Sequence, residues 1–376
     1  MIPLAFATLI AVSAPPRQDT MPDRWDSLAR FIEAAVARKA FPGAVVAVGR
    51  RDTILYLHAF GRLDYEGGRP VTTRTVYDLA SLTKVVGLTT AMMQLVEEGR
   101  VALDTPAVHY VPAFRDSTVT VRQLLTHSSG LPAWKPLYER AHSREEMFAL
   151  VDAEPLEVPP GTCMAYSDLG AIVLTQVVEH VTGQRLDRYL QAHLFRPLGM
   201  RDTRFRPPAS WRSRIAPTEM DTTYRHRLVR GEVHDENAFA MGGVSGHAGL
   251  FSTAPDLARF AQMLLRDGGT GAPGHGGTGH IVDSATVAEF SRVQDSTFSS
   301  RALGWDTPSK GSSAGDEMSA RAFGHTGFTG TSIWIDPAKD LFVILLTNRV
   351  HPTRQNDQIL RVRPEVADLA VRAAGK

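Results

Sequence analysis

A serine and a lysine stand three residues apart in the tetrapeptide Ser81-Leu82-Thr83-Lys84. The apolar residues that follow recur at helical spacing up to Glu98, so both side chains are expected on one face of a helix, within reach of each other. A serine hydroxyl is a poor nucleophile until a base removes its proton. A lysine amine can be that base only where burial or a nearby cation lowers its pKa. Taken alone, the spacing is more simply that of a capping serine and a solvated lysine.

A second candidate is Tyr166, which opens Tyr166-Ser167-Asp168 between a Pro-Pro-Gly turn and a helical pattern. A side chain at such a junction of loop and helix can project into a cleft. Beside a cationic lysine, a phenol can become an anion or relay a proton. Taken alone, the pattern favours a tyrosine that packs at a helix start with its hydroxyl in water.

A third candidate is Gly324-His325-Thr326-Gly327, which comes shortly before a predicted strand at 331–335. Small residues at this place let a substrate backbone approach the edge of a sheet closely. His325 and Thr326 supply polar contacts. Taken alone, the segment is more simply a glycine-rich turn into a strand.

The remaining sequence predicts strands at both ends of the chain and a mainly helical middle. The strand at 341–347 is apolar throughout, which indicates a central strand covered on both faces. A final helix is expected after Pro364. The other predicted elements are a helix at 22–40, a hairpin of 44–48 with 54–60, and helices at 81–98, 121–126, 169–181, 186–194 and 255–265.

The three motifs occur together and in this order, and the chain here resembles the serine β-lactamases and penicillin-recognising D,D-peptidases. That family carries Ser-x-x-Lys, then Tyr-x-Asn or a variant, then Lys/His-Thr-Gly on a strand. The separations, 85 residues from Ser81 to Tyr166 and 159 from Tyr166 to His325, are similar to those of the class C-like branch. That branch also contains esterases and D-amino-acid peptidases. The segments 124–131, 246–253 and 346–349 are typical of it too, and the resemblance extends from Arg24 to Leu369.

The resemblance implies an α/β (α+β) fold of the β-lactamase/transpeptidase type: a central antiparallel sheet flanked by helices, a mainly helical region, and the active site between them. Ser81 would attack a carbonyl and form an acyl-enzyme, while Lys84 and Tyr166 would share the general-base and general-acid roles. The backbone N–H groups of Ser81 and Phe328 would form the oxyanion hole. No metal or organic cofactor is implied. The residues that would contact the substrate are Asp168, His325, Thr326 and Gly327.

Two positions depart from the commoner pattern of the family. Asp168 stands where many members have asparagine, and a carboxylate near Lys84 would favour the charged lysine, which opposes its use as a neutral base. Either Asp168 points at the substrate instead, or Tyr166 carries more of the base role. His325 replaces the commoner lysine of the third motif, and histidine is mostly uncharged at neutral pH. This replacement lowers the expectation of a strong β-lactamase and leaves esterase or peptidase activity open.

We therefore expect a serine hydrolase that hydrolyses small esters or D-amino-acid amide or peptide bonds through an acyl-enzyme on Ser81. A class C-like β-lactamase and a penicillin-binding sensor that acylates without turnover are the alternatives. The expected substrates are small esters, β-lactams or peptidoglycan-like peptides. A net charge of +1 gives no argument for a nucleic-acid partner, and no stable membrane span is expected.

Residues 1–18 are expected to be a signal peptide or a disordered N-terminus. The apolar run 1–14 has the length of a signal-peptide core, and Val12-Ser13-Ala14 fits a cleavage site. Export to the periplasm or the medium is then expected, although the usual positive charges are missing and a cytoplasmic location is the alternative. Residues 19–376 form one hydrolase domain, with its sheet region at about 22–80 and 300–376 and its helical region at about 81–299.

Four further features have simpler interpretations than chemistry. The single cysteine, Cys163, is expected to be a small packing residue. The segment Gly243-Val244-Ser245-Gly246-His247 lacks the last glycine of a Gly-x-Ser-x-Gly elbow. The glycine-rich stretch 267–280 is expected to be a surface loop. A polar loop near the cleft, without zinc-site spacing, is expected for His234, Asp235, Glu236 and His247.

Overall fold

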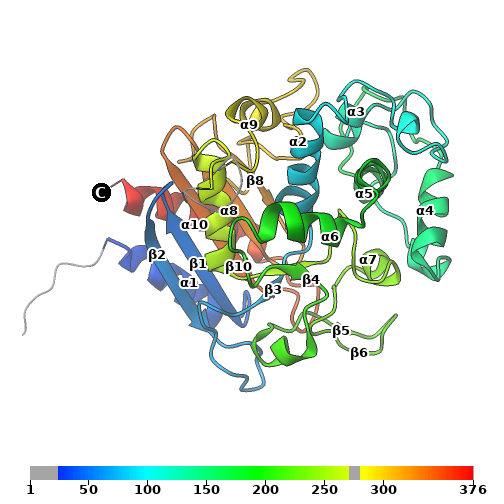
Figure 1. Ribbon diagram of the computed structural model, residues 1–376. Helices are drawn as coiled ribbons and strands as arrows, with labels where there is room; N and C mark the ends of the chain where they lie inside the picture. The colour runs from blue at the N-terminus through cyan, green and yellow to red at the C-terminus, as the bar shows by residue number, and fades with distance from the viewer. Residues whose placement is uncertain (1–23, 271–279, 376) are drawn as a thin grey trace, which may run out of the picture.

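The computed structural model describes residues 24–270 and 280–375, so the expected signal peptide at 1–18 and most of the glycine-rich stretch lie outside the described residues. One half of the molecule is a five-stranded sheet in the order β2-β1-β10-β9-β8, in which every neighbouring pair is antiparallel (Figure 1). Its strands are β1 (Gly43–Gly49), β2 (Ile54–Gly61), β8 (Phe323–Thr326), β9 (Ser332–Asp336) and β10 (Leu341–Thr347).

The apolar strand β10 lies in the middle of this sheet, and all seven of its residues are buried. Alternate side chains enter two separate cores, because successive residues of a strand point to opposite faces. Helix α8 (Ala254–Leu265) covers one face, while α1 (Asp26–Ala37) and α10 (Ile359–Ala374) cover the other. The prediction of a central antiparallel sheet flanked by helices is therefore confirmed.

The other half of the molecule is mainly helical (Figure 1). Two small sheets join it, β3-β7-β4 and β5-β6. None of the helices in the described ranges is long and apolar enough to cross a membrane. The elements of this half are β3 (Tyr77–Asp78), η1 (Lys84–Thr89), α2 (Thr90–Glu97), η2 (Ala107–His109), α3 (Val121–Leu125), η3 (Leu137–Glu139), α4 (Arg144–Asp152), α5 (Asp168–Thr182), α6 (Leu186–Leu190), η4 (Gln191–Phe195), β4 (Arg204–Phe205), η5 (Ala209–Arg214), β5 (Met220–Asp221), β6 (Arg227–Leu228), α7 (Glu236–Ala240), β7 (Leu250–Ser252) and α9 (Ser284–Ser291).

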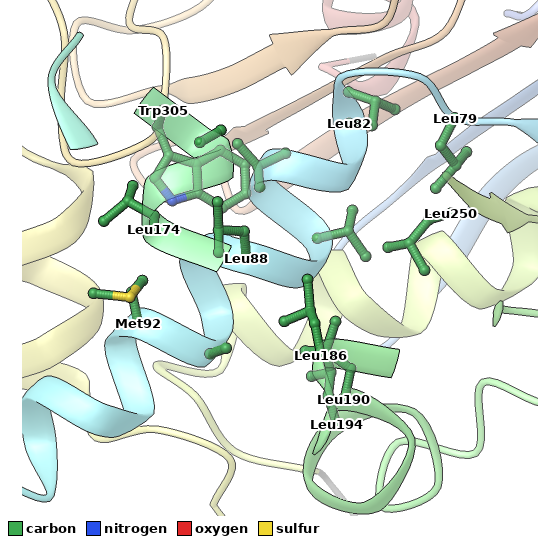
Figure 2. Close-up of a cluster of buried hydrophobic side chains, with 14 of the residues drawn as sticks. Leu79, Leu82, Leu88, Met92, Leu174, Leu186, Leu190, Leu194, Leu250 and Trp305 are labelled. Carbon is green, nitrogen blue, oxygen red and sulfur yellow. The ribbon is translucent and has the colours of Figure 1, made fainter. Parts of the chain in front are cut away.

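The helix predicted from Ser81 to Glu98 is present, but it is not uniform. Its first full turns, η1, are π-helical, and α2 continues them as an α-helix. Every residue of η1 is buried, because apolar side chains surround it on several sides. Figure 2 shows Leu82, Leu88 and Met92 among side chains that come from other helices and loops. A π-helical turn is frequent at functional sites, and here it lies directly after Ser81.

Two local predictions are wrong. The last helix does not follow Pro364 but begins at Ile359, with Pro364 inside it. A proline cannot donate to the carbonyl four residues earlier, which here belongs to Leu360, a residue 67% exposed and thus open to water. The burial of Ile359 and Val362 against the sheet outweighs that lost bond. Cys163, expected in packing, is exposed in the loop before α5.

Candidate active site

A strained turn places Ser81 between strand β3 and helix η1. Ala80 has a φ of +46°, a left-handed conformation that is unusual for alanine. The buried carboxylate of Asp78 holds this turn, because its Oδ1 accepts a hydrogen bond from the Ala80 N–H at 2.8 Å. Its Oδ2 accepts from the His234 N–H at 2.6 Å. Such strain persists only where the surroundings over-determine it, and it is concentrated at active sites.

The ammonium group of Lys84 is buried among three oxygen atoms. Its Nζ lies 2.9 Å from Ser81 Oγ, 3.0 Å from the carbonyl oxygen of His247 and 2.6 Å from Asp168 Oδ1. Burial lowers the pKa of Lys84, but Asp168 and then Tyr166 outweigh it, so the pKa lies above the ordinary value. Asp168 thus points at Lys84 and keeps it charged, as a carboxylate at this position is expected to do.

Tyr166 stands at the centre of the site. Its ring centroid lies 4.9 Å from Lys84 Nζ, 4.5 Å from the ring of His127 and 5.7 Å from the ring of His325. The hydroxyl is buried and makes no hydrogen bond of ordinary geometry to the described part of the chain. It is therefore available to exchange a proton with a neighbour or a substrate.

Two histidines beside Tyr166 are neutral. Burial, followed by the charges of Arg301 and Lys84, lowers the pKa of both His127 and His325 well below the usual range. His325 Nδ1 lies 2.8 Å from the carbonyl oxygen of Thr326, so Nδ1 carries the proton and the buried Nε2 is left without a partner among the described residues. His127 has the opposite tautomer, because its Nδ1 accepts from the Ser167 N–H at 3.1 Å.

Arg301 is a site residue that sequence reasoning missed. Its guanidinium carbon lies 5.2 Å from the centre of the Tyr166 ring, and its side chain is only 12% exposed. Nη1 is buried without a partner in the described ranges, and the ion pair from Nε to Asp306 is long, at 3.9 Å. No motif or periodicity marks this arginine, since it comes from a segment without regular structure. Only the folded chain brings it to Tyr166.

A pocket of about 450 Å³ lies in front of Ser81. Lys84 and Asp168 lie behind it. Neither the Ser81 N–H nor the Phe328 N–H donates a hydrogen bond within the described part of the chain, so both are free to bind an oxyanion. Gly327 brings β8 close to the Ser81 turn, because a Cβ there would lie 2.3 Å from the Leu79 carbonyl oxygen. The predicted residues that line the pocket are Ser81, Tyr166, His325, Thr326, Gly327 and Phe328.

The remaining polar residues of the sequence analysis support the site from behind. Ser245 Oγ, the His247 ring and Asp235 form a row with two contacts of 2.8 Å. Ser245 is fully buried, so no substrate reaches its hydroxyl. The His247 carbonyl accepts a hydrogen bond from Lys84, which connects the row to that lysine. His234 instead lies 3.0 Å from Glu219, so the two histidines do not share one site.

Known proteins of one family match most of this chain. The model of the Beta-lactamase family matches residues 28–367. An Escherichia coli K12 protein named "Putative D-alanyl-D-alanine carboxypeptidase" is 33% identical over 389 residues, covering 91% of this chain and 86% of that protein.

Two solved structures show the same fold. A penicillin-binding protein homologue from Caulobacter crescentus matches with a TM-score of 0.73 at 21% identity, over 94% of this chain and 99% of its own. EstCE1, described as a hydrolase with promiscuous acyltransferase activity, matches with a TM-score of 0.71 at 20% identity, over 91% and 98%. The motifs, the fold and the match of the family model together place this chain in the β-lactamase family.

Proposed function

We propose that the protein is a serine hydrolase that removes the C-terminal residue from peptides ending in D-amino acids. The observation that carries this proposal is Arg301, which lines the same pocket as Ser81 and whose buried Nη1 has no hydrogen-bond partner among the described residues. A guanidinium binds a carboxylate through parallel charge-assisted hydrogen bonds, and a peptide substrate of this kind ends in a carboxylate. The name of the Escherichia coli relative supports the same substrate class. An exported location, where peptidoglycan-like peptides occur, is part of the proposal.

In the proposed reaction, Ser81 Oγ attacks the carbonyl of the scissile bond and gives its proton to Tyr166, which acts as a phenolate base. Lys84 stays a cation beside Asp168 and stabilises the negative charge that develops on Oγ. The N–H groups of Ser81 and Phe328 bind the oxyanion. Tyr166 then protonates the departing amine, which leaves an acyl-enzyme. Water, with Tyr166 again as base, hydrolyses this ester and restores Ser81.

Three substrates test the proposal: a peptide ending in D-Ala-D-Ala, nitrocefin and p-nitrophenyl acetate. We expect release of D-alanine, and Ser81→Ala should lower all turnover by about 10³-fold or more. Ser309→Ala, which changes an exposed serine, is the matched control and should keep full activity. Full activity in Ser81→Ala would contradict the assignment of the nucleophile.

Arg301→Met tests the carboxylate site separately. We expect kcat/KM for the D-Ala-D-Ala peptide to fall by about tenfold to a hundredfold, the range for losing a hydrogen bond to a charged group. Hydrolysis of p-nitrophenyl acetate, which has no carboxylate, should change little. Arg292→Met removes an arginine that is 56% exposed and serves as the control. An equal loss on both substrates would remove the support for a carboxylate site.

A small-ester hydrolase is the second candidate. Two exposed apolar side chains, Phe328 at 48% and Leu360 at 67%, lie on the rim of the pocket and suit an apolar acyl group. Rapid ester hydrolysis without release of D-alanine would favour this candidate. A fluorescent penicillin that stays bound, together with no hydrolysis of any of the three substrates, would favour a non-turnover sensor instead.

A further inference from the structure

The turn between β8 and β9 is held by an arginine that comes from the far end of the chain. Arg363 lies on α10 and is 7% exposed. Its Nη2 donates to the Gly327 carbonyl at 2.5 Å and to the Thr331 carbonyl at 2.9 Å. It makes no ion pair within the described ranges, and burial followed by the charge of Arg349 lowers its pKa to about 9. A buried cation without an acidic partner is costly, so its contacts to these two carbonyls have to compensate.

The Gly327 carbonyl and the Phe328 N–H belong to one peptide group. The peptide bond is a resonance system, so a cationic donor on the oxygen draws electron density from the nitrogen and makes the N–H a stronger donor. The Gly330 N–H donates to the same oxygen at 3.0 Å, so this carbonyl accepts two hydrogen bonds. These two hydrogen bonds also prevent the peptide group from flipping. A flipped peptide would present its carbonyl oxygen, instead of its N–H, to the oxyanion.

A second arginine fixes the next peptide. Arg349 Nε donates to the Phe328 carbonyl at 2.8 Å, and its guanidinium carbon lies 4.3 Å from the centre of the Phe328 ring. Arg349 does not bond the peptide that carries the Phe328 N–H. The two arginines therefore hold the peptides on both sides of Phe328, but only Arg363 acts on the one that faces the oxyanion.

We infer that Arg363 is a positioning residue of the oxyanion hole, which orients and polarises the Gly327–Phe328 peptide during acyl transfer at Ser81. This inference rests on the proposed serine chemistry, but not on the identity of the peptide substrate. Arg363 also lines the pocket, so direct binding of a substrate carboxylate is the competing role. A neutral ester separates the two roles, because it has no carboxylate.

The test compares Arg363→Ala with Arg361→Ala, which removes an exposed arginine from the same helix. On p-nitrophenyl acetate we expect kcat per titrated active site to fall about tenfold to a hundredfold in Arg363→Ala, part of the 10²–10³ of a whole oxyanion donor. KM should stay within about twofold, as for an interaction made in the transition state. Affinity for phenylboronic acid, whose serine adduct is tetrahedral, should fall by the same factor as kcat.

Chemical rescue distinguishes polarisation from packing. Guanidinium ion at tens of millimolar should restore part of kcat in Arg363→Ala, whereas urea, a neutral molecule of similar shape, should not. Equal rescue of kcat by guanidinium ion and by urea would overturn the inference. It would also be overturned if Arg363→Ala lowered only the fraction of active sites that can be titrated and left kcat per site unchanged. A rise in KM alone would also overturn it, in favour of substrate binding. Where Arg363→Ala does not fold, Arg363→Lys takes its place. Its kcat is expected to lie below that of the wild type, and a kcat equal to that of the wild type would contradict the inference.

The two proposals fail in different ways. No release of D-alanine, together with ester hydrolysis that depends on Arg363, would reject the carboxypeptidase and leave the inference standing. Release of D-alanine with no effect of Arg363→Ala on the ester would reject the inference alone.

Discussion

The cations on the two sides of the pocket differ in whether a carboxylate lies close to them. On the helical wall, the buried cation of Lys84 has a carboxylate, Asp168, at 2.6 Å. On the opposite side, Arg301 has no acidic partner closer than Asp306, at 3.9 Å, among the described residues, and the neighbouring His325 is neutral. A paired buried charge acts on groups inside the protein, whereas an unpaired one is stabilised when an anionic ligand arrives. Under the proposed function, the helical wall therefore carries the chemistry and the other wall recognises the substrate.

The largest effect is expected from removing the paired cation. Lys84→Met should lower kcat on p-nitrophenyl acetate by about 10²–10³-fold, the usual contribution of a group that stabilises developing negative charge. Lys310→Met removes an exposed lysine and is the matched control. The values of kcat are compared per folded protein, and folding of each variant is checked by circular dichroism. A variant that keeps more than a tenth of its activity would contradict the role of Lys84.

Moving the cation from position 301 to position 325 tests substrate recognition on the second side of the pocket. In the double variant Arg301→Met/His325→Lys, a lysine at the third motif replaces the charge that Arg301 supplied. We expect KM for the D-Ala-D-Ala peptide to recover by about tenfold relative to Arg301→Met, since one charge-assisted hydrogen bond returns. His325→Lys alone should be less stable than wild type, because three cations then surround Tyr166. No recovery in the double variant would show that the position of the cation, rather than its presence, decides binding.

The pH profile of kcat in Asp168→Asn tests whether Lys84 acts as a cation. Asp168 raises the pKa of Lys84, so its removal should move the alkaline limb of the kcat profile to lower pH. The stability of the folded protein should also fall at alkaline pH. The contribution of charged Lys84 is complete below its unfolded-state pKa, about 10.5, and is lost as the pH rises through the raised value. An unchanged alkaline limb, with higher activity at neutral pH, would make Lys84 the base instead of Tyr166.

The smallest effect concerns the neutral histidines. The folded-state pKa values of His127 and His325 lie well below the usual 6.5, so the unfolded chain binds more protons between those values. Stability should therefore fall as the pH falls below about 6.5. In His325→Gln this loss should be smaller, by about a few degrees in Tm between pH 7.5 and 5. His142→Gln, at an exposed histidine, should leave the wild-type dependence unchanged.

The chemical groups with a local signature were predictable. Ser81 lies in the turn just before the helix and Lys84 lies one turn further on, so their spacing alone brings them together. The apolar run of β10 requires burial on both faces of the sheet. The prediction that the last helix begins after Pro364 was wrong, because the burial of Ile359 and Val362 outweighed the local rule against proline in helices. Arg301 and Arg363 had no signature at all, since an arginine in a loop or on a helix is usually solvated.

The amino-acid sequence by itself determined the nucleophile candidate, the order of the motifs and the strands and helices that carry them, because these depend on residue types and short spacings. Only the tertiary structure decided the charges of the site. Whether Lys84 is a cation depends on the distance to Asp168, and whether His325 is neutral depends on burial beside Arg301. Electrostatic energies depend on distance and solvent exposure, and for groups far apart in the chain both arise only when it folds.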